Sequence, residues 1–551
     1  MEQPRRAAFV GAIIAALITL PGLGAGTLWD NSETAYAEVA REILLTHDWV
    51  VMHLNGAPWF VQPPLYFWIA AGFAHAIGVT SLAFRLPAAL ATICMGAMTG
   101  YAVARQAGTQ VGVYASAILS SCLMQAVIGR LAIMDALLDL AIALAIFWWF
   151  RALEAGRDRY FIYGWIAVAF GSLAKGPVAP AVALLVFAAF AFWNGRSERM
   201  RLPSMRAWLG GCAIAFAIVA PWLAAIGVRS GFHALVELIG HYTVGRYTGV
   251  IENQAGPVWY YAPVVIIGFF PWIAFLPVSL AYGIRQLKTP TTSPKLARLW
   301  RLAFVWAIVP LVFFSFAKTK LPNYIALEFP ALALMVALYF DGVVKLGRNL
   351  ASILSAATVP VFIGIIAIAI AVFVRDNRIT SDALSVAPDL LVMGATIFVG
   401  SLLTALLLAS WNTRSFAPYA LATATALAMD ILAVVALPHA EAFKPIPHLA
   451  AAIDALRQPG DAVAIQDFRG FNALVFYTKP PVAMLSAPDA LPSADVSDAR
   501  AFVCSHDRIW LVGAEHRPGY DPTYGRTRVL VTSSDSAALY LYEGGRCSPE
   551  K

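Results

Sequence analysis

The stretch DALLDLAIALAIFWWFRALEAGRDRYFIYGWIAVAFGSLAKGPVAPAVALLVFAAFAFW (135–193) contains three apolar runs, and two short polar turns separate them. A membrane-spanning helix needs about 20 mostly apolar residues, and each run approaches that length. The first turn holds Arg151, Arg157 and Arg159, whereas the second holds Lys175. The pattern predicts three consecutive transmembrane helices with an arginine-rich loop on one side of the membrane.

The composition of the whole chain also indicates a polytopic membrane protein. Of its 551 residues, 60% are hydrophobic and 13% are charged, and the mean hydropathy is +0.70. Soluble proteins carry about 25% charged residues, so this chain cannot cover a water-facing surface of the usual kind. The composition excludes a disordered chain, a nucleic-acid-binding protein and a small disulfide-rich protein. The net charge of +7 is therefore first a question of topology.

Apolar runs along the chain predict about 13 transmembrane helices. They lie at roughly 7–25, 84–104, 109–128, 133–150, 160–174, 176–193, 207–228, 258–283, 302–317, 322–341, 349–374, 390–410 and 416–437. A further run, 64–79, is short, follows Pro63 and contains His75, which favours an interfacial or re-entrant helix. With the N-terminus inside, every basic cluster between the spans falls on one side, as the positive-inside rule requires. Counting 64–79 as a span would destroy that agreement.

An odd number of spans places the C-terminus outside. We expect a transmembrane domain at 1–439 with outer loops at 26–83 and 229–257, followed by an outer α/β domain at 440–551. That domain has a helical stretch at 448–457. Its strand-like runs are AVAIQ (462–466), LVFYT (474–478), RIWLVG (508–513), RVLVT (528–532) and ALYLYE (538–543). Cys504 and Cys547 lie in this region and could form a disulfide there, and the chain has no CxxC or Cys/His metal-binding pattern.

Ionisable residues at a membrane surface mark function by default, and here they gather at the outer ends of the spans. Asp30 and Glu33 begin an amphipathic helix in LWDNSETAYAEVAREIL (28–44). Helix capping explains acids at that position, and a catalytic role can coexist with it. Asp135, in GRLAIMDALLD (129–139), is a second candidate acid, and its alternative role is that of a helix-start residue near Arg130.

Basic residues on the same face predict an anion site. Lys175 lies between two apolar helices in LAKGPVAP (173–180). Its ammonium suits a phosphate as a point charge; the alternative is a lysine whose side chain only extends to the membrane–water interface. ELIGHYTVGRYTG (237–249) supplies His241 and Arg246. FSFAKTKLPNYIALEFP (314–330) supplies Lys318, Lys320 and Tyr324 on the side that should be poor in lysine. Several cations beside apolar walls indicate a substrate that is a lipid phosphate.

These residues carry a family resemblance. The segment LWDNSETAYAEVAREILLTHDWVVMHLNGAPWFVQPPLYFW (28–68) resembles the first periplasmic loop of the aminoarabinose (4-amino-4-deoxy-L-arabinose) lipid A transferase family. That family is related to the protein O-mannosyltransferases within the C-type glycosyltransferase superfamily. The resemblance continues through MDALL, AKGP, the His–Arg loop with PVWYYAPV, and FAKTKLPNY, in order and with similar spacing.

The resemblance implies a C-type glycosyltransferase fold and a multi-pass protein of the bacterial inner membrane, with a periplasmic active site. It also implies transfer of a sugar, first of all 4-amino-4-deoxy-L-arabinose, from undecaprenyl phosphate to a lipid acceptor such as a lipid A phosphate. By the same resemblance, Asp30, Glu33 and Asp135 are the catalytic acids. The predicted donor-phosphate and substrate contacts are Lys175, His241, Arg246, Lys318, Lys320 and Tyr324.

Two departures from the family pattern leave alternatives open. Ser32, and not an aspartate, precedes Glu33, and Val61–Gln62 stands where an acid and a lysine are common before the proline pair. Another sugar, a protein or polysaccharide acceptor, and a divalent metal therefore stay open. Two other classes are a secondary transporter, which would show repeats and a midplane site, and a ligase or binding scaffold. We expect a monomer that uses a lipid-linked sugar donor, with the divalent metal left open.

Overall fold

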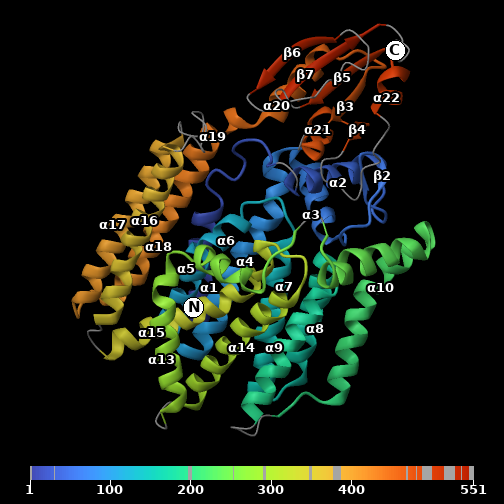
Figure 1. Ribbon diagram of the computed structural model, residues 1–551. Helices are drawn as coiled ribbons and strands as arrows, with labels where there is room; N and C mark the ends of the chain where they lie inside the picture. The colour runs from blue at the N-terminus through green and yellow to red at the C-terminus, as the bar shows by residue number, and fades with distance from the viewer. Residues whose placement is uncertain are drawn as a thin grey trace. The chain divides into compact units, whose positions relative to one another are not determined.

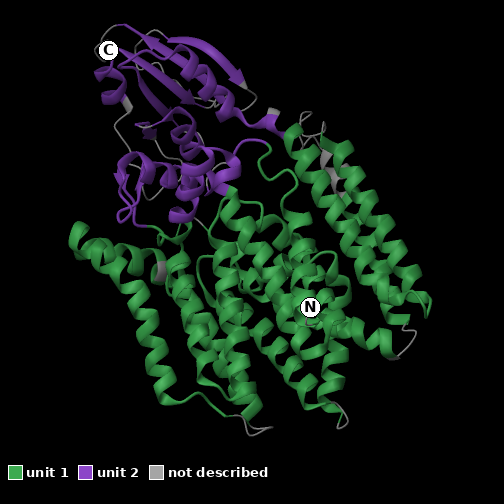
Figure 2. Cartoon of the chain, turned by 180° about the vertical axis from the view of Figure 1, so that it is seen from behind, with its two compact units in different colours: residues 1–25, 61–66, 85–439 green, residues 26–60, 67–84, 440–551 purple. Residues whose placement is uncertain are grey.

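The computed structural model describes residues 3–29, 32–195, 201–251, 254–289, 293–346, 350–375, 386–466, 470–479, 481–486, 499–513, 528–534 and 537–544. The chain forms two compact units (Figure 2). Unit 1 comprises residues 1–25, 61–66 and 85–439. Unit 2 comprises residues 26–60, 67–84 and 440–551, so the first outer loop and the C-terminal residues belong to one compact body.

Unit 1 is a bundle of long apolar helices (Figure 1). Its main helices are α1 (Gln3–Thr19), α4 (Ser81–Ala107, which begins in unit 2), α5 (Thr109–Ser121), α6 (Leu123–Ile128), α7 (Asp135–Ala155), α8 (Asp158–Lys175), α9 (Val178–Gly195), α10 (Met205–Leu235), α12 (Tyr261–Gly268), α13 (Leu276–Lys288), α14 (Pro294–Phe316), α15 (Phe329–Leu346), α16 (Leu350–Arg375), α17 (Ala387–Ala409) and α18 (Ala417–Ile431). Every predicted span overlaps one or two of these helices.

Within the described residues, nine helices are long and apolar enough to cross a membrane. A tenth span results if Val258–Gly268 and Trp272–Lys288, which meet at 106°, count as one. The predicted spans 7–25, 109–128 and 160–174 fall on α1, α5 with α6, and α8, outside that set. The multi-pass architecture is confirmed, while the count of thirteen stays a prediction. The run 64–79 forms α3 (Leu65–Ile77), which has 13 residues and is too short to span.

Glycines allow the helices of unit 1 to pack closely around buried tryptophans. A Cβ at Gly164 of α8 would lie 2.2 Å from the indole Nε1 of Trp149, which belongs to α7. That indole is buried and donates to the carbonyl of Phe161 at 3.0 Å. The contact joins α7 and α8 as an antiparallel hairpin, so the first residue of α7 and the last residue of α8 meet at one end.

The C-terminal part of unit 2 is an α/β sandwich. Its sheet has the order β4-β3-β5-β7-β6, in which β4, β3 and β5 are parallel and β7 and β6 are antiparallel additions. The strands are β3 (Ala462–Gln466), β4 (Ala483–Ser486), β5 (Arg508–Gly513), β6 (Arg528–Ser534) and β7 (Ala537–Glu543). Helices α20 (Pro445–Leu456) and α21 (Phe471–Thr478) pack on one face, and α22 (Ala499–Ser505) packs on the other.

The predicted α/β class is confirmed, and one of its predicted strands is wrong. The run LVFYT (474–478) lies in helix α21, and β4 was not predicted. Nearly all residues of α21 are buried, so the run shows no polar face from which a period of 3.6 or 2 could be read. Cys504 is disulfide-bonded, whereas Cys547 lies outside the described residues.

The first outer loop begins with helix α2 (Ser32–Thr46), as the spacing of its apolar residues predicts. A short hairpin of β1 (His53–Leu54) and β2 (Ala57–Pro58) follows. Asn55 and Gly56 join the strands with φ values of 56° and 78°. Positive φ at both positions is the geometry of a type I′ turn, for which Asn-Gly is the preferred pair.

Candidate active site

The centre of the candidate site is an ion pair between the ends of α7 and α8. The Lys175 Nζ lies 2.6 Å from Asp135 Oδ1, and the two side chains are 14% and 6% exposed. Gly176 ends α8 with φ 71° and ψ −151°, a conformation that favours glycine. Asn323 Nδ2 also donates to Asp135 Oδ1, at 2.7 Å. The Asp135 carboxylate therefore contacts the Lys175 ammonium directly and fixes its position.

A second cation, Arg246, is held beside this pair by the loop that follows α14. Its Nη1 lies 3.4 Å from the Tyr324 hydroxyl and 3.3 Å from Gln254 Oε1. The Thr319 N–H donates to the Arg246 carbonyl at 3.0 Å, so backbone as well as side chain joins the two segments. Lys175 Nζ lies 5.0 Å from the centroid of the Tyr324 ring, which is within cation–π range.

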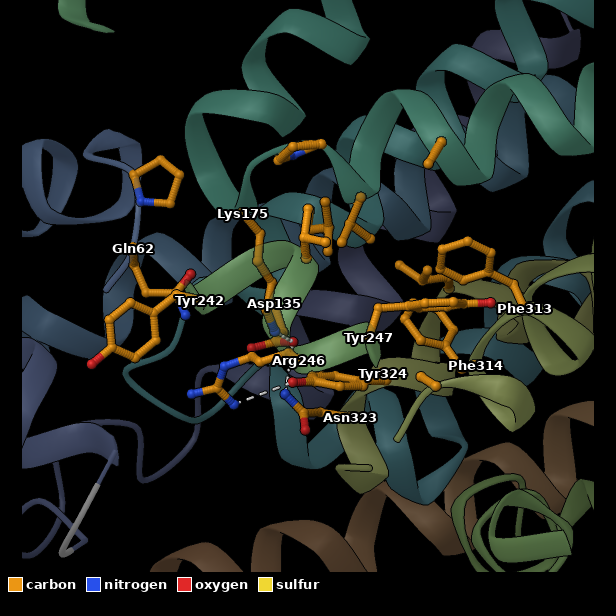
Figure 3. A pocket seen from close by; sticks show the side chains of 18 of the residues that line it. Gln62, Asp135, Lys175, Tyr242, Arg246, Tyr247, Phe313, Phe314, Asn323 and Tyr324 are labelled. Carbon is orange, nitrogen blue, oxygen red and sulfur yellow. Dashed lines mark hydrogen bonds and ion pairs between the residues drawn. The ribbon is translucent and has the colours of Figure 1, made fainter. Parts of the chain in front are cut away.

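These groups surround one cavity of about 250 Å³ within unit 1. Figure 3 shows Lys175, Asp135, Arg246 and Asn323 close together, with Tyr247, Phe313 and Phe314 grouped farther along the cavity. The cavity therefore has a polar region with two cations and an aromatic, apolar region. That division suits a ligand that joins an anionic group to a hydrocarbon chain.

Lys320, which the sequence also places among the phosphate contacts, has a different environment. It is 4% exposed and does not line the cavity. Its Nζ donates to the carbonyls of Phe314, Ser315 and Ala317 at 3.2, 2.7 and 2.7 Å, and so caps the C-terminus of α14. Burial, and to a smaller extent the charge of Lys318, lowers the pKa of Lys320.

Lys318, His241 and Glu33 do not line the cavity. Lys318 and His241 are exposed, and the His241 ring packs edge-on against Tyr242 at 4.8 Å between centroids. Asp30 lies outside the described residues. Glu33 belongs to unit 2, is 2% exposed, lies in the first turn of α2, and accepts the Trp29 N–H at 2.8 Å.

Several cavity residues were not predicted as site residues. Asn323, Tyr242, Tyr247, Phe313 and Phe314 line the cavity with the predicted ones. Asn323 was missed because it carries no charge. Its position between the candidates Lys320 and Tyr324, in the LPNY motif, was the signal in the sequence that could have indicated it. Val61 and Gln62, one of the two departures from the family pattern, also line the cavity.

One turn below Asp135, α7 buries a second acid. Asp139 is 2% exposed. Its electrostatic neighbours are Asp135, Lys175 and Gln125. Among the described residues, no group of three or more His, Cys, Asp and Glu side chains could hold a metal ion.

Comparison with known proteins gives these features a context. Residues 61–224 match the dolichyl-phosphate-mannose-protein mannosyltransferase family model. The undecaprenyl phosphate-alpha-4-amino-4-deoxy-L-arabinose arabinosyl transferase 2 of Proteus mirabilis is 29% identical over 345 residues, which are 61% of this chain and 60% of that protein. The enzyme of the same name from Sodalis glossinidius is 31% identical over 335 residues, 59% of this chain and 58% of that protein.

A solved structure extends the likeness to the whole chain. ArnT from Cupriavidus metallidurans, crystallised with undecaprenyl phosphate, superposes with a TM-score of 0.78 at 20% identity. The match covers 98% of this chain and 99% of ArnT. This chain has the ArnT fold.

The predicted resemblance to the aminoarabinose transferases and the predicted C-type glycosyltransferase fold are thus confirmed. The ArnT fold extends over both units, because the superposition includes nearly all residues. In sequence, the match spans about three fifths of the length of the curated relatives.

Proposed function

We propose that this protein is a glycosyltransferase that moves a sugar from an undecaprenyl-phosphate donor to a lipid acceptor. The observation that carries the proposal is the cavity in which Lys175 and Arg246 stand at a polar region beside an aromatic wall. The names of the similar proteins make 4-amino-4-deoxy-L-arabinose the first sugar to test. A lipid A phosphate is the matching acceptor.

In the proposed reaction, an acceptor oxygen attacks the anomeric carbon of the donor sugar. The bond from that carbon to the donor phosphate oxygen breaks, and the electron pair leaves with undecaprenyl phosphate. Lys175 and Arg246 stabilise the charge that develops on this leaving phosphate. Asp135 and Asn323 keep Lys175 in place, and the Tyr324 hydroxyl does the same for Arg246.

The acceptor decides whether a general base is needed. A lipid A phosphate is already ionised, so the protein only has to position it. A hydroxyl acceptor must lose a proton, and Asp30 or Glu33 is the proposed base for that case. His241, Lys318 and Lys320 complete the proposed set, with Lys320 acting through the loop that it caps.

A second candidate function is transfer of another sugar, or transfer to a protein or polysaccharide. The family model that matches residues 61–224 describes a protein mannosyltransferase, which favours this alternative. The neutral Gln62 in the cavity lining also differs from the lysine that is common in the aminoarabinose transferases. Under either function, we propose a monomer in the bacterial inner membrane with its site and C-terminal residues on the periplasmic side.

The experiment is a transfer assay with the purified full chain in lipid nanodiscs. Undecaprenyl-phosphate-linked 4-amino-4-deoxy-L-arabinose is supplied with lipid A, and mass spectrometry identifies the products. Parallel reactions use a mannose-phosphate lipid donor, and others a peptide acceptor. Modified lipid A supports the first function and a mannosylated peptide the second. If no donor releases its polyprenyl phosphate, both proposed functions are wrong.

A further inference from the structure

The short segment before helix α2 is held by side chains of the C-terminal residues, all within unit 2. The Tyr477 hydroxyl of α21 accepts the Leu28 N–H at 2.9 Å. Lys444 Nζ donates to the Thr27 carbonyl at 3.0 Å and lies 3.9 Å from the centroid of the Trp29 ring. Glu441 accepts the Thr27 hydroxyl proton and pairs with Lys444. Three consecutive residues of the loop are therefore fixed by one small cluster.

This fixed segment leads directly to the acids of the first loop. The N–H of Trp29 donates to Glu33 Oε2 at 2.8 Å, so the residue that packs on Lys444 also binds the Glu33 carboxylate. Asp30 is the next residue along the chain. A shift of the Thr27–Trp29 backbone would consequently move the hydrogen-bond donor of Glu33.

Two more polar contacts tie the same loop to the C-terminal residues. Arg41 of α2 is buried and donates from Nη1 to the Phe476 carbonyl at 2.8 Å, next to Tyr477 in sequence. Asn55, in the turn of the hairpin, exchanges two hydrogen bonds with the backbone of Val482 at 2.9 and 3.0 Å. Directional contacts at three separate places determine orientation, which apolar packing alone does not do.

We infer that the C-terminal α/β part positions the acidic start of α2, and that Tyr477 and Lys444 are positioning residues for the reaction. The inference rests on the proposed function with a hydroxyl acceptor, for which Glu33 or Asp30 is the proposed base. It gives the C-terminal part a role that does not require it to touch the substrate. Loss of either contact changes the chemical step and leaves donor binding in place.

The test compares Tyr477→Phe with Tyr540→Phe in the full-length protein. Tyr477→Phe keeps the ring and removes the hydroxyl that accepts the Leu28 N–H. Tyr540, on β7, stacks under Arg528 at 4.1 Å in the same unit and serves as the matched control. A small misplacement of reacting groups costs up to about 100-fold, and loss of one hydrogen bond about tenfold. With a hydroxyl acceptor, we therefore expect kcat to fall about tenfold in Tyr477→Phe, with the donor KM unchanged.

Lys444 supplies an independent variant with a built-in rescue. Lys444→Met should lower kcat like Tyr477→Phe, and Lys444→Arg should restore most of it because the guanidinium keeps both the charge and the donors. Unchanged kcat in Tyr477→Phe and Lys444→Met, or an equal loss in Tyr540→Phe, overturns the inference.

Hydrogen exchange separates this inference from the proposed function. Peptides that cover residues 27–35 should exchange faster in Tyr477→Phe than in the wild type or in Tyr540→Phe. If the wild-type protein transfers no sugar, the proposed function fails, and the exchange rates still show whether Tyr477 orders the segment. Equal exchange in all three proteins contradicts the inference even if the wild type is active.

Discussion

The last residue of α8 and the loop after α14 each place a lysine beside the end of an apolar helix, but the two lysines have different partners. Lys175 pairs with the Asp135 carboxylate and lines the cavity. Lys320 donates to three backbone carbonyls of its own helix end and does not line the cavity. The Lys175 ammonium is held by a carboxylate at the cavity wall, where it can also contact an anionic ligand. The Lys320 ammonium donates its hydrogen bonds to the helix end and does not face the cavity. Position in the topology alone does not separate these two roles.

The largest effect expected from this comparison is that of Lys175→Met. Removing an electrostatic stabiliser of a developing charge costs about 10² to 10³-fold in kcat, and we expect that loss here. The assay is transfer of the sugar to lipid A by the purified variant, with melting temperature as the measure of folding. Lys345→Met is the control, because Lys345 is 67% exposed and pairs only with Asp341 among the described residues. Full activity in Lys175→Met would remove the phosphate contact from the proposal.

Lys320→Met should have a smaller effect on activity and a clear effect on stability. Hydrogen bonds from a charged group contribute about 1.5–3 kcal/mol each, and the variant leaves three carbonyls without this donor. We expect a lower melting temperature and about a tenfold lower kcat, since the loop that carries Asn323 and Tyr324 begins there. A variant that melts like the wild type but loses as much activity as Lys175→Met would contradict the distinction between the two lysines.

Tyr324→Phe tests the second cation with a still smaller change. The variant keeps the ring that lies under Lys175 and removes only the hydroxyl at 3.4 Å from Arg246. A weak hydrogen bond of this kind contributes about 0.5–1.5 kcal/mol, so we expect the donor KM to rise about threefold. Tyr163→Phe, on the exposed side of α8, is the control. An unchanged KM would show that Arg246 does not depend on Tyr324.

Charged residues at the end of an apolar helix are easy to recognise in the sequence, and the charged candidates for this site were chosen in that way. Asp135, Lys175, Arg246 and Tyr324 were predicted from that contrast, and all four line one cavity. Asn323 was not, since a neutral amide changes neither charge nor hydropathy. The capping role of Lys320 depends on where the carbonyls of α14 end, and no one-dimensional pattern contains that geometry.

The fold, too, was predicted where the sequence pattern is clear and missed where it is not. Long apolar helices and the alternating strands β3, β5, β6 and β7 were predicted from period and length. Helix α21 was not, because a short run in which seven of eight residues are buried fits a helix or a strand equally. The association of the first outer loop with the C-terminal residues is also invisible in sequence, since contacts such as Leu28 to Tyr477 join residues 449 positions apart.

Arg41 has both kinds of partner that separate Lys175 from Lys320. A substitution of its partner Glu38 is expected to have the smallest effect, a change in how stability depends on pH. The Arg41 guanidinium donates to the Phe476 carbonyl, as Lys320 does to carbonyls, and pairs with Glu38 at 2.7 Å, as Lys175 does with Asp135. Burial raises the pKa of Glu38 to about 8, against the opposing effect of Arg41. The unfolded chain loses this proton near the ordinary value of 4.5, and the folded chain keeps it until about 8. The resulting stabilisation is complete below pH 4.5 and is lost as the pH rises through 8.

Glu38→Gln should therefore flatten the dependence of stability on pH. Glutamine keeps the hydrogen-bonding shape of the protonated acid and does not titrate, so its melting temperature should fall less than that of the wild type between about pH 5 and about pH 9. Glu543→Gln, at an exposed position on β7, is the control and should follow the wild-type curve. Parallel curves for the wild type and Glu38→Gln would mean that Glu38 is ionised beside Arg41 throughout this range. Arg41 and Glu38 would then form an ion pair, which resembles the Lys175–Asp135 pair more than it resembles the contacts of Lys320 with backbone carbonyls.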